Sequence, residues 1–167
     1  MKRTNWILGL LFLATMPISQ ALASEAEKPS KAQVTHGFRI GYTYGHNLDR
    51  NTNFDIRSSH MSTMGYEVTE AIDSGLDGFR IVFVQNLVVS GLEQGLALPS
   101  LSALVGYELF GIAQMGVGGN FGVTGARMII AAGFNPQAGN FQVPVHMHFI
   151  PDPSGDWRIG LSTGVNF

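Results

Sequence analysis

Hydrophobic and polar residues alternate along most of this chain in segments of about ten residues, a period typical of β-strands with two different faces. Clusters of Gly, Pro, Asn and Asp separate the segments. No long segment repeats apolar residues at the spacing of an amphipathic helix. We predict eight strands, over residues 36–46, 60–72, 78–90, 98–109, 112–121, 124–134, 140–150 and 156–167.

Alternate positions in these segments form two contrasting faces. One face is apolar and rich in aromatic residues, with Gln85 as its one clear polar interruption. The other combines Gly, Ser and Thr with isolated charges and contains no Lys. Its charged and titratable members are Arg39, Glu67, Arg80, Glu108, Arg127, His146, His148 and Arg158.

These faces fit two kinds of barrel. In a soluble ligand-binding barrel the apolar face would point inward, and the outer face would need Lys and Glu for solubility and to protect strand edges. In a membrane barrel the apolar face points to lipid and the polar face lines the interior. The absence of Lys and the many small residues on the polar face favour the membrane barrel.

The first residues predict export. Lys2 and Arg3 precede an apolar run, Ile7 to Ile18, and the small residues Ala21-Leu22-Ala23 follow it. This order is typical of a secretory signal peptide, and the run is too short to span a bilayer. We expect cleavage after Ala23, a flexible periplasmic leader over residues 24–35, and one barrel domain over residues 36–167.

Composition narrows the function classes. Once Lys2 and Arg3 are removed, 12 acidic residues outnumber eight basic ones, so nothing suggests nucleic-acid binding. The chain has no Cys, which excludes disulfides, a thiol nucleophile and a lipid-modified cysteine. Charged residues make up 13% of the chain, about half the share usual in soluble domains.

The last segment, Trp157 to Phe167, alternates without a break and ends the chain on an aromatic residue. It resembles the terminal strand of bacterial outer-membrane barrels, and the whole predicted mature chain resembles the small eight-stranded OmpA and OmpX type. The resemblance implies an all-β, antiparallel, up-and-down transmembrane β-barrel. It also implies that Phe167 is part of the signal read by the barrel-assembly machinery.

An even strand number would leave both chain ends in the periplasm. The connections near Asp73, Phe110 and Asn135 would then be periplasmic turns, and those near Asn47, Gly91, Gly122 and Pro151 would be external. Aromatic residues near segment ends would lie at the two membrane interfaces. They are Tyr44, Phe79, Phe134, Phe141, Phe149, Trp157 and Phe167.

Eight strands enclose an interior just wide enough for side chains, so we expect no open pore. Unpaired charges inside would be costly, which predicts a hydrogen-bonded lumenal charge network. Its predicted members are Arg39, Glu67, Arg80, Glu108, Arg127, His148 and Arg158. With tight flanking turns, His148 would lie level with Arg127 and Arg158. Four Arg facing two Glu leave an anion or lipid-headgroup site as an alternative.

Catalytic chemistry has only weak candidates, namely His146, His148, Ser162 and Glu108. Barrel enzymes that deacylate lipid A carry a His-x-Ser pair on one strand, and here the Ser position holds His148. His146 and His148 share a face, but no third metal ligand accompanies them, and we expect no metal or cofactor. The histidines at strand ends, His36, His46 and His60, are expected to serve surface roles.

The sequence therefore favours a monomeric outer-membrane barrel with a structural or envelope-integrity role. Its expected partners are outer-membrane lipid, lipopolysaccharide and, during insertion, the barrel-assembly machinery. Two alternatives stay open. One is a lipid A-modifying acyl hydrolase or transferase in the same fold, and the other is a soluble periplasmic ligand-binding barrel.

Overall fold

The computed structural model of this chain describes residues 32–48, 56–139 and 141–167. The predicted signal peptide, most of the predicted leader and the middle of the first predicted external loop lie outside them. Among the described residues, no helix is long and apolar enough to cross a membrane. A short 3-10 turn, η3 (Leu92–Gln94), lies in the connection between β3 (Phe79–Ser90) and β4 (Leu98–Leu109).

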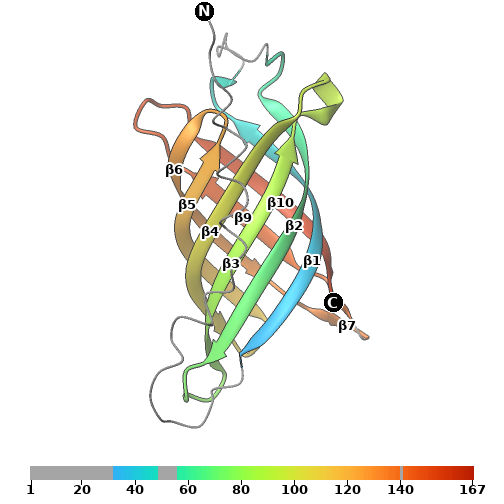
Figure 1. Cartoon of the computed structure of the whole chain (residues 1–167), viewed down its shortest axis with the longest axis vertical. Helices are drawn as coiled ribbons and strands as arrows, with labels where there is room; N and C mark the ends of the chain where they lie inside the picture. The colour runs from blue at the N-terminus through green and yellow to red at the C-terminus, as the bar shows by residue number, and fades with distance from the viewer. Residues whose placement is uncertain (1–31, 49–55, 140) are drawn as a thin grey trace, which may run out of the picture.

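Eight long antiparallel strands dominate the described part of the chain (Figure 1). They are β1 (Gln33–Gly45), β2 (His60–Asp73), β3 (Phe79–Ser90), β4 (Leu98–Leu109), β5 (Ala113–Gly122), β6 (Gly125–Phe134), β9 (Val145–Ile150) and β10 (Arg158–Asn166). Each pairs with the next, and β10 pairs with β1, so the sheet closes on itself. The predicted eight-stranded, up-and-down barrel is confirmed, and β1 begins three residues earlier than predicted.

The last residue takes part in closing the barrel. Phe167 exchanges two backbone hydrogen bonds with His36, of 2.8 and 3.1 Å. Its ring lies 6.0 Å from the ring of Phe38 on the outer surface. The chain terminus is therefore held at the β1–β10 seam.

The two ends of the barrel differ. The start of β1, the end of β10 and the connections β2–β3, β4–β5 and β6–β9 lie at one end, called the terminal end below, and the other four connections lie at the distal end. At the terminal end, β4 and β5 are joined through Phe110 and Gly111, both with positive φ. That geometry matches the right-handed twist of a two-residue hairpin, and the Phe110 amide donates to the Gly78 carbonyl at 2.6 Å.

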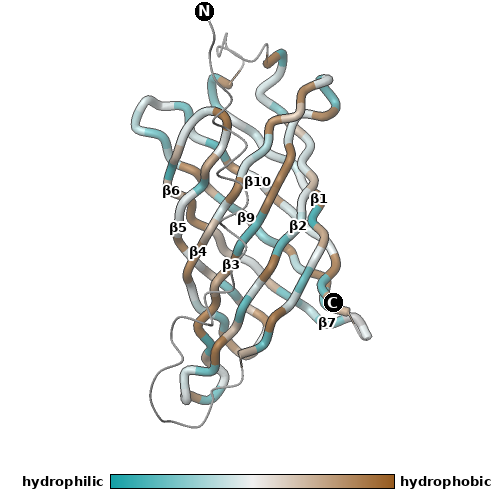
Figure 2. The backbone as a smooth tube through the Cα atoms, viewed as in Figure 1, coloured by the Kyte–Doolittle hydropathy of each residue, from teal (hydrophilic) through white to brown (hydrophobic). Residues whose placement is uncertain are grey.

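The outer surface is apolar around the whole circumference. Figure 2 shows hydrophobic residues interspersed with hydrophilic ones along the strands. The exposed large side chains include Phe38 (62%), Ile40 (61%), Met147 (53%) and Leu161 (56%). Soluble monomers rarely expose so large a continuous apolar surface, whereas a membrane barrel requires one.

An aromatic cluster covers the distal rim next to this surface. The Trp157 ring stacks on His46 at 5.4 Å and lies 5.6 Å from Tyr44. Phe149 is 6.2 Å from Trp157, and His60 is 5.1 Å from Tyr44. Amphipathic rings at this height suit a membrane–water interface.

The lumen is less polar than the sequence suggested. Leu104, Ile129 and Ile150 point inward and form a buried apolar cluster, with Val84 and Ala131 packed against it. The inward charges and hydroxyls therefore face an apolar wall formed by β3, β4, β6 and β9. The alternation missed this wall because β3 and β6 carry apolar residues on both faces, as in Ile81-Val82-Phe83-Val84.

A second apolar cluster lies at the distal end. Leu48 and Ile56, from the β1–β2 connection, pack with Met61, and Leu96 and Leu98 lie against them. The three central residues are 3–5% exposed. This group, called the distal plug below, covers one side of the barrel mouth.

The predicted strand over residues 140–150 is wrong in its first part. The short strands β7 (Gln137–Ala138) and β8 (Phe141–Gln142) pair as a small hairpin, and β9 begins only at Val145. The hairpin turns at Gly139, which has a positive φ, and the buried Pro144 precedes β9. The β6–β9 connection is consequently longer than a tight turn, and this shifts the register of β9.

Candidate functional site

The lumen holds the predicted charged residues and the weak catalytic candidates. Its most buried ion pair joins Arg39 on β1 to Glu67 on β2. Their Nη2 and Oε1 atoms are 2.5 Å apart, and the side chains are 3% and 4% exposed. Glu67 also accepts from Asn86 Nδ2 at 3.3 Å and from Thr69 Oγ1 at 3.4 Å. Its second oxygen lies 3.9 Å from His146 Nδ1. The carboxylate thus has several partners, as a buried charge requires.

A second ion pair lies nearer the terminal end, where Arg80 meets Glu108 across the β3–β4 pair. Arg80 Nε donates to Glu108 Oε1 at 2.7 Å, and Nη1 donates to Gln33 Oε1 at 2.7 Å. Gln114 Nε2 donates to the other Glu108 oxygen at 2.6 Å. These contacts link four neighbouring or facing strands across the barrel interior.

The third pair, at the distal end, involves a carboxylate that sequence reasoning missed. Arg127 on β6 pairs with Asp152 in the β9–β10 connection. Asp152 was interpreted only as a turn residue, and it does form that turn, accepting from the Ser154 amide at 2.9 Å. Continuing the β6–β9 register past the strand end would have placed residue 152 opposite Arg127, but the register itself was mispredicted.

Hydrogen bonds within the β9–β10 connection lower the pKa of Asp152, which lies outside the membrane-spanning strands. The Ser154 amide and hydroxyl, and then Arg127, lower its pKa from 3.8 to about 2. Each of these groups donates to the charged carboxylate and so favours it. The third lumenal carboxylate is therefore an anion at neutral pH.

The predicted position of His148 is wrong. His148 is paired in register with Ala131 on β6 and Gly160 on β10, not with Arg127 and Arg158. The late start of β9 shifts its pairing with β6, and the start of β10 at Arg158, two residues later than predicted, shifts its pairing with β10. Among the described residues His148 has no hydrogen-bond partner. Its ring fills the space that a Cβ at Gly160 would occupy.

His146 lies in a different environment, although it shares a face with His148. Its Nε2 is 2.9 Å from Asn135 Oδ1, and its Nδ1 faces Glu67. Ser162 is its register partner on β10, but no hydrogen bond joins the two side chains. Glu108 is engaged with Arg80 and Gln114 instead. The weak catalytic candidates therefore do not assemble into a nucleophile–base pair.

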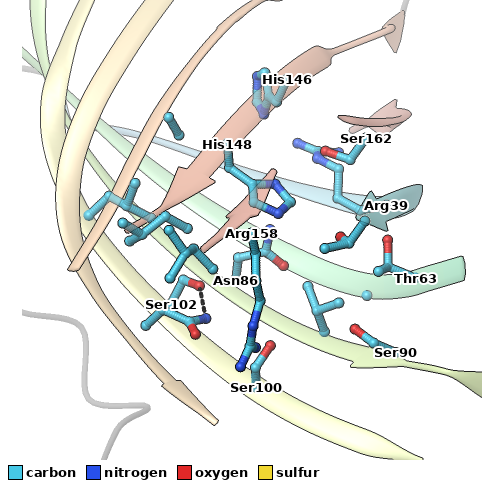
Figure 3. Close-up of a pocket in the computed structure, with 18 of the residues that line it drawn as sticks. Arg39, Thr63, Asn86, Ser90, Ser100, Ser102, His146, His148, Arg158 and Ser162 are labelled. Carbon is cyan, nitrogen blue, oxygen red and sulfur yellow. Dashed lines mark hydrogen bonds between the residues drawn. The ribbon is translucent and has the colours of Figure 1, made fainter. Parts of the chain in front are cut away.

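No cluster of three or more His, Cys, Asp or Glu side chains within the described ranges could hold a metal ion. A cavity of about 130 Å³ does lie in the lumen between the charged groups and the apolar wall. His148, Arg158 and several hydroxyl groups point into it (Figure 3). Its enclosed position and polar lining suit a binding site for a small ligand.

No protein-family model matches the chain, and no curated protein matches it. Among solved structures it is similar to Ail, the attachment invasion locus protein of Yersinia pestis, at 13% identity and a TM-score of 0.50. That match covers 84% of this chain and 100% of the other. The chain has the fold of a transmembrane β-barrel. A designed transmembrane β-barrel also matches, at 10% identity and a TM-score of 0.47, over 84% and 97% of the two chains.

Proposed function

We propose that this chain is an outer-membrane β-barrel of Gram-negative type with a structural, envelope-integrity role and no open pore. The observation that carries the proposal is the combination of an apolar outer surface with a lumen crossed by ion pairs. The first feature fits a barrel surrounded by lipid, and the second supports a lumen without an open pore. The likeness to Ail supports the fold and is consistent with this location.

Side-chain contacts at several levels of the barrel support a closed lumen. Arg39, Glu67 and His146 meet across its middle, with Arg80 and Glu108 nearer the terminal end. The distal plug covers part of the opposite mouth. An eight-stranded barrel is only wide enough to be filled by such side chains. A barrel filled with side chains fits a structural role in the envelope better than a role in transport.

The same proposal includes the targeting signals. Residues 1–23 are a signal peptide cleaved after Ala23, and Phe167 is read by the barrel-assembly machinery. The terminal end then faces the periplasm, and the distal end, with its aromatic rim, faces outward. Lipid and lipopolysaccharide are the partners of the outer surface.

The lipid-enzyme alternative finds no support in the geometry. His146, His148 and Ser162 face the lumen, whereas acyl chains would contact the opposite face of each strand. Lipid A mass spectra from cells with and without the protein test this point, and a new or missing acyl chain would revive the enzyme. The soluble-barrel alternative is disfavoured by the exposed apolar surface.

The test of the main proposal combines location with conductance. Membrane fractions are separated by density, and the refolded protein is added to a planar bilayer beside a general porin as positive control. We expect the protein in the outer-membrane fraction, starting at Ser24, with no steady conductance. Recovery in the soluble periplasm would refute the proposed location. Stable ohmic channels would refute the absence of an open pore.

A further inference from the structure

Arg158 differs from the other lumenal arginines in its contacts. It is the first residue of β10 and points into the cavity (Figure 3). Its Nη2 donates to Thr124 Oγ1 at 2.6 Å, and its buried Nε has no partner among the described residues. A guanidinium carries five N–H donors, so the bond to Thr124 uses only a small part of the hydrogen-bonding capacity of Arg158.

The charge of Arg158 is also uncompensated at close range. Within the described residues, Arg39, Arg80 and Arg127 each have a carboxylate within 4.0 Å, and Arg158 has none. The two nearest acidic residues in sequence are already engaged. Asp152 binds Arg127 and Ser154, and Asp156 lies 3.5 Å from the Ser154 hydroxyl.

Thr124 brings a second positive charge to the same place. Its hydroxyl oxygen accepts from Arg127 Nη1 at 2.7 Å as well as from Arg158 Nη2. Two guanidinium groups therefore converge on one neutral oxygen, and the Asp152 and Asp156 carboxylates lie near enough to attract Arg158 without forming a direct ion pair with it. Because no carboxylate contacts Arg158 directly, its buried Nε–H can still donate to an anion in the cavity.

The cavity next to Arg158 offers further donors. Thr43, Thr63, Ser90, Ser100 and Ser162 line it, and none of these hydroxyls has a hydrogen-bond partner in the described part of the chain. Hydroxyl groups can rotate to donate to an anion. The carboxylate at the cavity edge, Glu67, is occupied by Arg39.

We propose that Arg158 and the neighbouring cavity hydroxyls hold a small inorganic anion, of halide or phosphate size, in the distal half of the lumen. A cavity of about 130 Å³ has room for such an ion with some water. The apolar wall on the opposite side excludes bulk water and strengthens the attraction between the ion and the guanidinium. This inference goes beyond the structural role proposed above and stands on separate contacts.

The test measures anion-dependent stability of the full barrel in detergent micelles. The fluorescence of Trp157 monitors urea unfolding. Sodium gluconate, whose anion is too large for the cavity, is replaced by chloride or phosphate at constant ionic strength. A bound ion raises the unfolding midpoint in a saturable way. Comparing the two salts distinguishes a halide from an oxyanion.

Two variants locate the effect. Arg158→Gln should weaken the apparent affinity by about tenfold or more, since it removes a charge-assisted contact. The double variant R80Q/E108Q, which removes one positive and one negative charge elsewhere in the lumen, should respond like the unmodified protein. An equal response of Arg158→Gln would overturn the proposal.

Diffraction provides a second measurement that needs no variant. Crystals soaked in sodium bromide should show an anomalous peak within hydrogen-bond distance of the Arg158 guanidinium. If Arg158→Gln does not refold, the presence or absence of this peak tests whether an anion binds at Arg158. No peak together with no salt-specific stabilisation means that water alone fills the cavity, and the proposal is then wrong.

Discussion

The imidazole of His146 lies over Gly133, its partner across the β6–β9 pair. A Cβ at Gly133 would overlap that ring and come within 2.5 Å of the Val145 carbonyl oxygen. The same relationship joins His148 to Gly160 and Asn166 to Gly37. Large inward side chains in this barrel thus occupy space that a glycine on the adjacent strand leaves open.

The first prediction follows from this packing. Gly133→Ala should lower the free energy of unfolding by about 1–3 kcal/mol, because the added methyl overpacks the lumen. Gly122→Ala is the matched control, since an added Cβ there meets no atom closer than 3.5 Å. Urea unfolding in micelles measures both. Equal stabilities of the two variants would show that His146 does not depend on the space above Gly133.

The second prediction concerns the buried ion pair. Glu67→Gln leaves Arg39 without a carboxylate in a site where both side chains are nearly inaccessible. Breaking a buried pair from one side costs about 3–5 kcal/mol. Glu93→Gln, in the exposed η3 turn where Glu93 accepts from Ser62, should cost less than about 1 kcal/mol. Similar unfolding midpoints for the two variants would argue against a paired lumen.

The third prediction is a pH dependence in the β9–β10 connection. The pKa of Asp152 falls from 3.8 to about 2 through its bonds to Ser154 and Arg127. Because folding lowers this pKa, the resulting stabilisation is complete above pH 4 and is lost as the pH falls towards 2. Carboxyl-carbon NMR in micelles should show a midpoint near 2 that rises in Ser154→Ala. A midpoint near 3.8 in the unmodified protein would contradict the turn contacts.

Much of the fold was predictable because lipid imposes a strict alternation on strands. The predicted limits of 60–72, 78–90 and 98–109 agree with β2, β3 and β4 to within one residue. One face of these strands contacts lipid and the other lines the lumen, so apolar and polar residues alternate along each strand with a period of two. The inward positions of Arg39, Glu67 and His146 follow from the same pattern.

The candidate site was less predictable because it depends on register. The β7–β8 hairpin has only two residues in each strand and continues the alternation of its surroundings, so the sequence pattern did not separate it from β9. This shift moved His148 away from Arg127 and brought Asp152 to it. Pairing between strands depends on the length of each connection, and alternation within one strand contains no information about that length.

The fourth prediction concerns insertion. Removing Phe167 should reduce the amount of folded barrel in the outer membrane several-fold, because it deletes both the proposed assembly signal and the backbone bonds to His36. Phe167→Trp keeps an aromatic terminus and should restore most of the yield. Heat-dependent gel mobility of membrane fractions measures the folded fraction. Normal yields from the deletion would remove Phe167 from the assembly signal.

The orientation of the two strand faces is the central claim, and the absence of cysteine allows a direct measurement. Spin labels are placed on single cysteines at Leu161, which is 56% exposed, and at the adjacent inward Ser162, and the protein is inserted into lipid vesicles. Collisions with oxygen report lipid, and collisions with a water-soluble nickel chelate report solvent. The account predicts high oxygen and low nickel accessibility at 161, and low accessibility to both at 162. High nickel accessibility at 161 would contradict a membrane-spanning barrel.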